Sequence, residues 1–253
     1  MVGKSGVPND AVEKFRIGPL ISEEEKENKD YFQTKEGRVH FFKNTWPENC
    51  SEFQDKLSSY YHEMETLSKK LLQLIEFTFK LPPGRLTSCV NYHTSILSAN
   101  FYAVLESAVE EQFIRIAEHT DVSLFTIVAE SSFTSSLALE FWNEDQRKWE
   151  KINFPPQSFV VNIGDCFQYW SDGLLNSAKH RVAQYPRPRD DKECAIFDDD
   201  NHRISLAFFF SPNYDTTLLW HDAENAIQKI TPKSYSSWRR DKIRSAIRAV
   251  KSG

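Results

Sequence analysis

The stretch Phe113–Val128 reads F-I-R-I-A-E-H-T-D-V-S-L-F-T-I-V and places His119 and Asp121 two residues apart in an apolar run with high β propensity. Residues i and i+2 of a strand point to the same face. We therefore expect the imidazole and the carboxylate to project side by side into one cavity. A second histidine, His180, would complete a set of two histidines and one carboxylate. Such a set holds non-haem Fe(II) and leaves one side of the metal open.

The rest of the chain predicts a mostly β fold with flanking helices. Apolar residues recur at helical spacing from 51 to 80, where Pro82-Pro83-Gly84 ends the pattern, and predict a long helix packed on a sheet. From about residue 95 the pattern shortens into candidate strands separated by turn residues: 96–104, 111–118, 124–129, 137–142, 149–152, 159–162, 166–170, 181–184 and 203–210. Many short strands at this spacing predict a barrel or jelly roll.

The same pattern divides the chain into three regions of one compact unit. Residues 1–90 are expected to form a mainly helical flanking region, 91–215 the β core, and 216–253 a helical tail. The tail carries a basic amphipathic pattern, for which a helix lying on its own domain is favoured over a membrane-surface helix.

Composition excludes several classes of partner. The net charge is −5 and the basic residues form no large patch, so we expect no nucleic-acid partner. The four cysteines are scattered without a C-x-x-C pair, which indicates a reducing compartment. There is no signal-peptide core and no apolar run of membrane-spanning length. We expect a cytoplasmic, soluble monomer that makes no membrane contact and acts on a small molecule.

Two further pairs at i and i+2 could meet an organic acid. Arg203 and Ser205 share a strand face, and a guanidinium with a neighbouring hydroxyl suits a carboxylate. The alternative pairs Arg203 with the acidic run 198–200. Asn100 and Tyr102 also share a face and could offer an amide and a phenol, although a purely structural strand is the alternative.

One basic residue of the opening stretch is a candidate for substrate binding. Arg115 precedes His119 by four residues and would share its inward face, from which it could bind a substrate carboxylate. A shifted strand register, which would leave Arg115 in solvent, is the alternative.

Four motifs occur in order and carry a resemblance to a known family. They are H-T-D at 119–121, N-I-G-D at 162–165, D-G-L-L-N-S-A-K-H-R-V at 172–182 and R-I-S at 203–205. Together they resemble the iron(II)- and 2-oxoglutarate-dependent oxygenase superfamily, in the branch of isopenicillin N synthase and the plant oxygenases. The resemblance extends from about residue 20 to about residue 220.

The resemblance implies a double-stranded β-helix (jelly roll) and a set of roles. His119, Asp121 and His180 would be the iron ligands, with no catalytic residue beyond them. Arg203 and Ser205 would bind the distal carboxylate of 2-oxoglutarate, the cosubstrate. Tyr102 and Asn100 match the tyrosine and asparagine that branch members place near the cosubstrate.

The implied reaction consumes Fe(II)-activated O2 and 2-oxoglutarate, and releases succinate and CO2. The organic substrate, expected to be a small secondary metabolite, would be hydroxylated, desaturated or cyclised. One alternative is an isopenicillin N synthase-like iron oxidase that does not use 2-oxoglutarate. Another is a non-catalytic module that binds a small acid on the same fold.

The chain also departs from the family pattern. The early β-strand with which family members begin is not recognisable, which implies a truncated or divergent form with an exposed sheet edge. About a dozen additional residues lie between His180 and Arg203, and we interpret 187–202 as a solvated acidic loop, which could lie over the mouth of the site.

Overall fold

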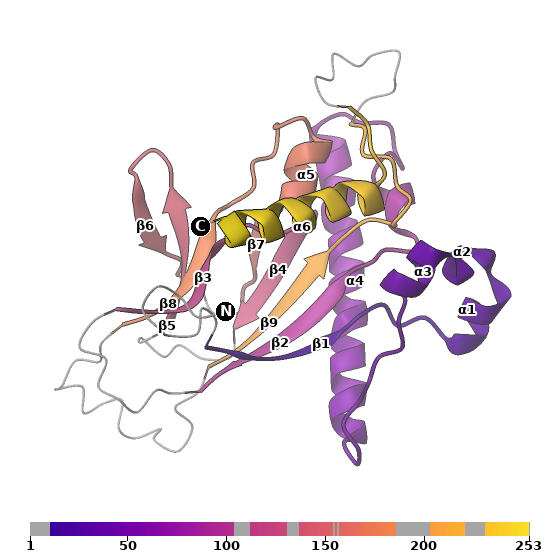
Figure 1. The fold of residues 1–253 in the computed structure, drawn as a ribbon, viewed down its shortest axis with the longest axis horizontal. Helices are drawn as coiled ribbons and strands as arrows, with labels where there is room; N and C mark the ends of the chain where they lie inside the picture. The colour runs from indigo at the N-terminus through magenta and orange to yellow at the C-terminus, as the bar shows by residue number, and fades with distance from the viewer. Residues whose placement is uncertain are drawn as a thin grey trace.

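Two antiparallel sheets form the centre of the molecule (Figure 1). The computed structural model describes residues 11–103, 112–130, 137–153, 155, 157–185, 203–220 and 231–252. The larger sheet has the order β1-β2-β9-β4-β7 and the smaller one the order β3-β8-β5-β6. The strands are β1 (Glu13–Ile17), β2 (Ile96–Tyr102), β3 (Phe113–His119), β4 (Phe125–Glu130), β5 (Leu137–Asn143), β6 (Lys148–Lys151), β7 (Val160–Ile163), β8 (His180–Gln184) and β9 (Arg203–Phe210).

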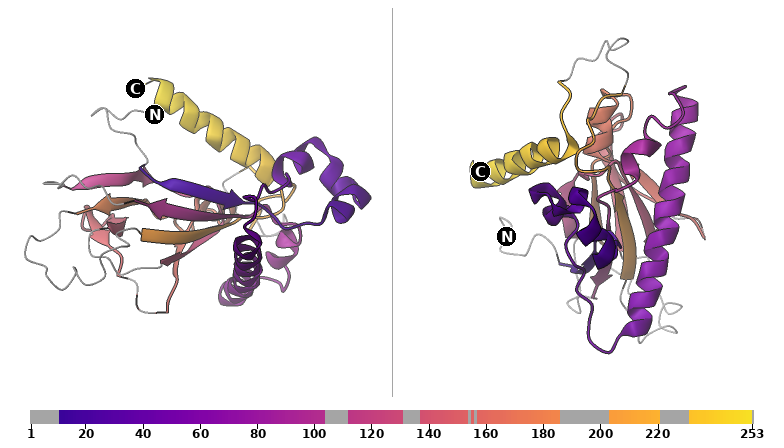
Figure 2. Two further views of the ribbon diagram at one scale, coloured as in Figure 1. Left: turned by 90° about the horizontal axis from the view of Figure 1, so that it is seen from below. Right: turned by 90° about the vertical axis from the view of Figure 1, so that its right-hand side faces the viewer.

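Strand β9 shows how the sequence defines the two faces of the larger sheet. Its Phe208 and Phe210 are fully buried in the main apolar core. The ring of Tyr61, on the long helix α4 (Ser51–Thr78), meets Phe208 edge-on with centroids 5.1 Å apart. The alternate residues Arg203 and Ser205 point to the opposite face, because successive side chains of a strand alternate. One face of the sheet therefore packs against α4, which runs along it in Figure 2. The other face lines a cavity.

The remaining helices lie around the sheets. They are α1 (Glu23–Asn28), α2 (Asp30–Gln33), α3 (Lys35–His40), the 3-10 helix η1 (Thr87–Val90), α5 (Asp165–Trp170) and α6 (Tyr235–Ser252). Ser22 caps α1 by accepting a hydrogen bond from the Glu25 backbone N–H at 3.1 Å. The main apolar core joins Ile17, Leu57, Phe208 and Trp238. Residues of all three predicted regions thus share one core.

The mostly β architecture and the jelly-roll fold class are confirmed, and two local predictions are wrong. Residues 166–170 were expected to be a strand but belong to helix α5. Gly164 is the N-cap of this helix and Asp165 lies in its first turn, where a negative charge is favourable. A short apolar run has no periodicity that separates a buried strand from a buried helix turn.

The second correction concerns the sheet edge. Strand β1 lies within the region expected to be mainly helical and pairs antiparallel with β2, from Glu13 opposite Phe101 to Ile17 opposite Leu97. An exposed sheet edge was expected without this strand; in the structure β1 pairs with β2 and covers that side of it. Strand β1 alternates like β9, so that Phe15 and Ile17 pack on the main core while Lys14 and Arg16 line the cavity.

Two other sequence predictions concern the acidic loop and membrane-spanning helices. The predicted acidic loop 187–202 lies outside the described residues. Within the described ranges, the helices are all too short or too polar to cross a bilayer.

Candidate metal centre

His119, Asp121 and His180 come together where the two sheets meet. Strand β3 ends at His119, and the chain turns through 120–124 before β4 begins. Asp121 therefore lies in the turn. The prediction that His119 and Asp121 share one face of a single strand gave the wrong reason for their proximity. His180 begins β8, and its backbone is paired with that of His119 across the smaller sheet. The strand pairing brings together residues 61 positions apart in the sequence.

The three side chains present their ligand atoms to one point. His119 Nε2 lies 3.7 Å from Asp121 Oδ1, and His180 Nε2 lies 3.8 Å from Asp121 Oδ2. The candidate ligand atoms all lie within 4.8 Å of one another, and the two imidazole centroids are 4.3 Å apart. Asp121 and His180 are largely buried, with 5% and 12% of their side chains exposed, whereas His119 is 40% exposed. This geometry fits a metal bound at the wall of a cavity that opens to solvent.

Backbone carbonyls fix which nitrogen of each imidazole faces the carboxylate. Nδ1 of His119 lies 2.8 Å from the Ala117 carbonyl oxygen, and Nδ1 of His180 lies 2.9 Å from that of Ala178. A carbonyl can only accept, so each Nδ1 carries the proton and each Nε2 is the acceptor nitrogen. Neutral imidazoles with this tautomer are common metal ligands.

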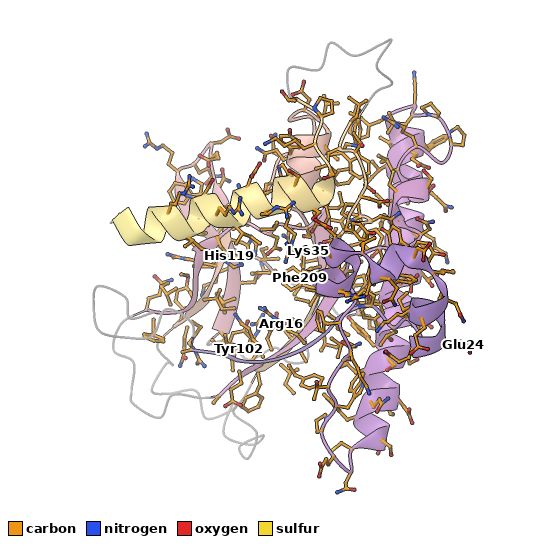
Figure 3. All side chains as sticks on the ribbon, turned by 45° about the vertical axis from the view of Figure 1, so that its right-hand side comes forward. Arg16, Glu24, Lys35, Tyr102, His119 and Phe209 are labelled. Atoms are coloured by element: carbon orange, nitrogen blue, oxygen red, sulfur yellow. The ribbon has the colours of Figure 1, made fainter. Side chains whose placement is uncertain are left out.

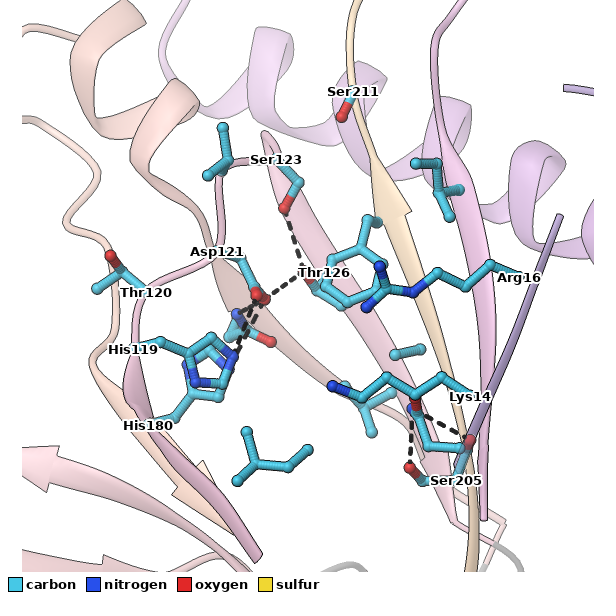
Figure 4. Close-up of a pocket in the computed structure, with 18 of the residues that line it drawn as sticks. Lys14, Arg16, His119, Thr120, Asp121, Ser123, Thr126, His180, Ser205 and Ser211 are labelled. Atoms are coloured by element: carbon cyan, nitrogen blue, oxygen red, sulfur yellow. Dashed lines mark hydrogen bonds and ion pairs between the residues drawn. The ribbon is translucent and has the colours of Figure 1, made fainter. Parts of the chain in front are cut away.

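Two polar side chains orient Asp121. Its Oδ2 accepts hydrogen bonds from Thr126 Oγ1 at 2.5 Å and from Asn162 Nδ2 at 2.9 Å (Figure 4). Thr126 in turn lies 3.1 Å from Ser123 Oγ. Thr126 belongs to β4 and Asn162 to β7, which are neighbours in the larger sheet. The larger sheet thus holds the carboxylate in place opposite the histidines of the smaller sheet.

The turn that carries Asp121 rests directly on the N-I-G-D motif. The Asp165 backbone N–H donates to the Asp121 carbonyl at 2.7 Å. The Asp165 carboxylate accepts from Thr120 Oγ1 at 2.9 Å and lies 2.8 Å from Lys242 Nζ of α6. A Cβ on Gly164 would come within 2.2 Å of the Ser123 carbonyl oxygen. Only glycine allows this close contact between the two chain segments.

A second polar set lies on β2 and β9. Backbone pairing places Asn100 opposite Ser205 and Tyr102 opposite Arg203. Asn100 Nδ2 donates to Ser205 Oγ at 3.3 Å, and the Arg203 guanidinium carbon lies 4.9 Å from the centre of the Tyr102 ring. The four residues are all at least nine-tenths buried. The structure thus brings together the predicted cosubstrate residues on one wall.

Among the described residues, the Arg203 guanidinium donates to the carboxylate of Glu130 and leaves one buried nitrogen without a hydrogen bond. Its Nε donates to Glu130 Oε1 at 2.5 Å, whereas its buried Nη1 has no hydrogen-bond partner among the described residues. The side chain is 1% exposed. An unpaired buried donor is unfavourable, so the site fits an additional anionic acceptor. The carboxylate that pairs with Arg203 is therefore that of Glu130. From the sequence, the acidic run 198–200 was the protein partner considered for this arginine.

The charges on this wall shift two pKa values. Desolvation opposes the charge of Arg203, but the hydrogen bond and negative charge of Glu130 outweigh it and raise the pKa of the guanidinium. Burial raises the pKa of the Tyr102 hydroxyl, against the opposing charge of Arg203. Arg203 is therefore a permanent cation, and Tyr102 a neutral hydrogen-bonding group.

One cavity of about 590 Å³ joins the histidine–aspartate cluster to the Arg203 wall. Both polar sets line it, together with Val39, Phe42, Ile116, Leu139 and Phe209. A cavity of this volume is within the range of small-molecule sites. The lining combines charged, polar and apolar side chains, which suits a cosubstrate bound beside a second organic molecule.

Arg115 occupies a different position from the one predicted. It is 2% exposed, donates to the Ala11 and Ala103 carbonyls and to Gln184 Oε1, and is not among the residues that line the cavity. The pairing of β3 with β8 shifts register twice between Ile114 and His119, so a count of four residues does not preserve the face. Burial lowers the pKa of this guanidinium. Arg115 is therefore not part of the proposed substrate site.

The sequence analysis assigned no role to some of the residues that form the site. Thr126 is one of many hydroxyls in strands, and its contact with Asp121 depends on the turn between them. Asn162 was quoted within the N-I-G-D motif, but without a partner. Lys14 and Arg16 line the cavity from β1, a strand that the sequence pattern did not reveal.

The residues present fit both groups that the resemblance implies. Two imidazoles and one carboxylate with converging ligand atoms are a donor set for non-haem Fe(II). The unpartnered Nη1 of Arg203, beside Ser205 and Tyr102, fits a carboxylate of 2-oxoglutarate.

Comparison with known proteins agrees with this donor set. Residues 90–212 match the model of the 2OG-Fe(II) oxygenase superfamily. The 2-oxoglutarate-dependent dioxygenase ecdK of Aspergillus rugulosus is 28% identical over 208 residues, which are 81% of this chain and 56% of that protein. Validamycin A dioxygenase of Streptomyces hygroscopicus subsp. limoneus is 25% identical over 219 residues, with 86% of this chain and 54% of that protein covered.

A solved structure extends the likeness to the fold. The crystal structure of a full-length Neurospora crassa protein in complex with alpha-KG matches with a TM-score of 0.72 at 18% identity, over 92% of this chain and 66% of that chain. The chain spans about half the length of the curated relatives it matches. On its motifs and these matches, residues 90–212 of the chain form a domain of the iron(II)- and 2-oxoglutarate-dependent oxygenase superfamily.

Proposed function

We propose that this protein is an Fe(II)- and 2-oxoglutarate-dependent oxygenase that oxidises a small organic molecule. One observation carries the proposal: the cavity at which His119, Asp121 and His180 converge is also lined by Arg203, whose buried Nη1 has no hydrogen-bond partner among the residues that the structure describes. A metal ligand set and an anion site in one cavity suit a cosubstrate with an acid group at each end. The names of the relatives support the same cosubstrate.

Each side chain has a proposed part in binding. His119, Asp121 and His180 would hold Fe(II), with Thr126 and Asn162 fixing the carboxylate rotamer of Asp121. The chemistry that Fe(II) and 2-oxoglutarate supply when bound is oxidative decarboxylation to succinate and CO2, coupled to oxidation of the substrate by O2.

The β2–β9 wall would receive the distal carboxylate of the cosubstrate. Arg203 supplies charge and an N–H donor, and Ser205 and Tyr102 supply hydroxyls. Asn100 keeps the Ser205 hydroxyl oriented through its 3.3 Å hydrogen bond. Burial of this wall strengthens each charge-assisted hydrogen bond, because little water competes for the donors. The whole set would thereby fix the cosubstrate in one orientation relative to the metal ligands.

The test is production of succinate by purified protein supplied with Fe(II), O2 and 2-oxoglutarate. We expect iron-dependent succinate formation by the wild type, and loss of both bound iron and succinate in Asp121→Ala. Val39→Ala, at the cavity mouth, should retain bound iron. Consumption of O2 with an organic substrate but without succinate would favour an isopenicillin N synthase-like oxidase. Absence of both metal binding and 2-oxoglutarate decarboxylation would favour a non-catalytic module.

A further inference from the structure

Helix α6, together with α3 and the residues that follow it, forms one wall of the cavity. This α3–α6 wall is contributed by Val39, His40, Phe42, Tyr235 and Arg239, which all line the cavity. The imidazole of His40, at the end of α3, lies 6.5 Å from the Tyr235 ring of α6, measured between centroids. Figure 2 shows α6 and α4 on opposite sides of the larger sheet. The wall therefore lies on the side of the cavity, and it adds a guanidinium and an imidazole to the lining.

The α3–α6 wall and the proposed cosubstrate residues lie at opposite ends of β9. Arg203 begins the strand, and the alternate residues from Arg203 to Ser211 line the cavity. The Tyr235 side chain, one helical turn before Arg239, interacts with the side chain of Ser211, just beyond the end of the strand. Eight residues of extended chain span roughly 26 Å. A cosubstrate bound at Arg203 therefore leaves the α6 end of the cavity for another molecule.

Contacts of α6 hold the wall beside the turn that carries a metal ligand. Lys242, three residues after Arg239, has its Nζ 2.8 Å from the Asp165 carboxylate. That carboxylate accepts a hydrogen bond from Thr120 Oγ1, in the turn between β3 and β4. Trp238 is buried in the main apolar core, which anchors the beginning of the helix. A molecule bound at Arg239 would therefore lie near the metal ligands.

Two polar side chains of the α3–α6 wall are available to a ligand. Within the part of the chain that the structure describes, neither the Arg239 guanidinium nor the His40 imidazole forms a hydrogen bond or an ion pair. The nearby carboxylate of Glu36 lies 3.9 Å from Nη1 of Arg240. Burial, and then the charge of Arg239, lower the pKa of His40 to about 4, against the opposing effect of Glu36. Near neutral pH the wall therefore presents a charged guanidinium and a neutral imidazole, which suit a single anionic group.

We propose that Arg239 binds a carboxylate of the organic substrate, with His40 as a neutral hydrogen-bond donor, so that the substrate class is a small organic acid. This inference rests on the proposed function, because it assigns the substrate of that site. The planar guanidinium offers two parallel N–H donors to a carboxylate. The apolar side chains of the lining, which include Phe42 and Phe209, would contact the rest of the molecule.

The experiment is a binding titration in two stages on protein loaded with Mn(II), without turnover. The first stage measures 2-oxoglutarate. The second, at saturating 2-oxoglutarate, compares phenylacetate, cinnamate and octanoate with their neutral amides. We expect at least one acid to bind about 10-fold or more tightly than its amide, and Arg239→Gln to reduce this preference roughly 10-fold, because a charge-assisted hydrogen bond is lost. Arg239→Lys should retain part of the preference, and His40→Phe, which keeps a ring without its N–H, should reduce it less.

A matched control and the contradictory outcomes separate this inference from the proposed function. Arg240→Gln replaces the next residue of α6, which is outside the cavity lining, and should leave the acid preference unchanged. Failure to bind Mn(II) and 2-oxoglutarate in the first stage would contradict the proposed function. Success there, followed by no acid preference in any pair or by a preference that Arg239→Gln retains, would overturn the assignment of Arg239. Loss of 2-oxoglutarate binding in Arg239→Gln would also overturn it, because the residue would then serve the cosubstrate.

Discussion

Replacement of Gly164 by alanine should weaken metal binding without removing any ligand. A Cβ at this position would lie 2.2 Å from the Ser123 carbonyl oxygen, 2.9 Å from the Ser123 carbonyl carbon and 3.0 Å from the Asp121 carbonyl oxygen. An ordinary carbon–oxygen contact is roughly 3.3 Å, so the two segments must separate by about 1 Å. The segment displaced is the turn that carries Asp121.

The size of the effect follows from that displacement. Changes in the groups that orient metal ligands reduce affinity by roughly 10- to 100-fold, and we expect Gly164→Ala to fall within this range. Overpacking should also lower the free energy of unfolding by about 1–3 kcal/mol. The assay is competition for Mn(II) between the protein and a chelator, with unfolding of the metal-free protein followed by urea titration.

Gly84→Ala is the matched control for this prediction. Gly84 has a φ of +86°, and a Cβ added there would meet no heavy atom within 4 Å, so the change introduces backbone strain without a contact. We expect reduced stability and unchanged metal affinity. Thr126→Val provides a second approach, because it removes a donor to Asp121 without adding bulk at Gly164. Wild-type metal affinity in both folded variants, Gly164→Ala and Thr126→Val, would refute the reasoning.

Three further predictions concern ionisable side chains that are buried or largely buried. Glu76→Ala removes a buried carboxylate that accepts backbone N–H groups beyond the end of α4, and should cost about 3 kcal/mol in urea unfolding, against less than about 0.5 kcal/mol for exposed Glu63→Ala. Burial lowers the pKa of His40 from 6.5 to about 4, so the unfolded chain binds more protons between these values. Stability should therefore fall as the pH decreases from 6.5 to 4, and His40→Gln should flatten this slope in thermal unfolding. Glu130→Gln removes a negative charge beside Arg203 and should tighten 2-oxoglutarate binding to the Mn(II)-loaded protein several-fold, while lowering stability by roughly 2 kcal/mol. Weaker binding would show instead that Glu130 serves mainly to orient the guanidinium.

The candidate metal ligands could be found from the sequence because they are either close neighbours in the chain or part of a recognisable motif. His119 and Asp121 are two residues apart, and His180 lies within a long motif. The reason given for their proximity was nevertheless incomplete. Asp121 reaches the histidines through a turn held by Gly164, whose close approach becomes evident only when β4 and β7 are paired.

The elements that escaped prediction depend on contacts distant in the chain. Strand β1 has five residues, too few for periodicity to be distinctive, and its strand conformation is completed by pairing with β2, 80 to 88 residues further along the chain. The face of Arg115 depends on the register shifts between β3 and β8, which no count along one strand reveals. Arg16, Tyr102 and His119, which are labelled in Figure 3, come from three different strands, β1, β2 and β3.

Anaerobic equilibrium dialysis with Fe(II), followed by titration with 2-oxoglutarate, tests the central claim most directly. The account predicts one Fe(II) per chain, and one 2-oxoglutarate that binds tightly only when the metal is present. Asp121→Ala should lose the iron, whereas Arg203→Gln should keep the iron and lose the cosubstrate. Wild-type protein that is folded but binds no stoichiometric Fe(II), or Asp121→Ala protein that binds it as the wild type does, would contradict the account.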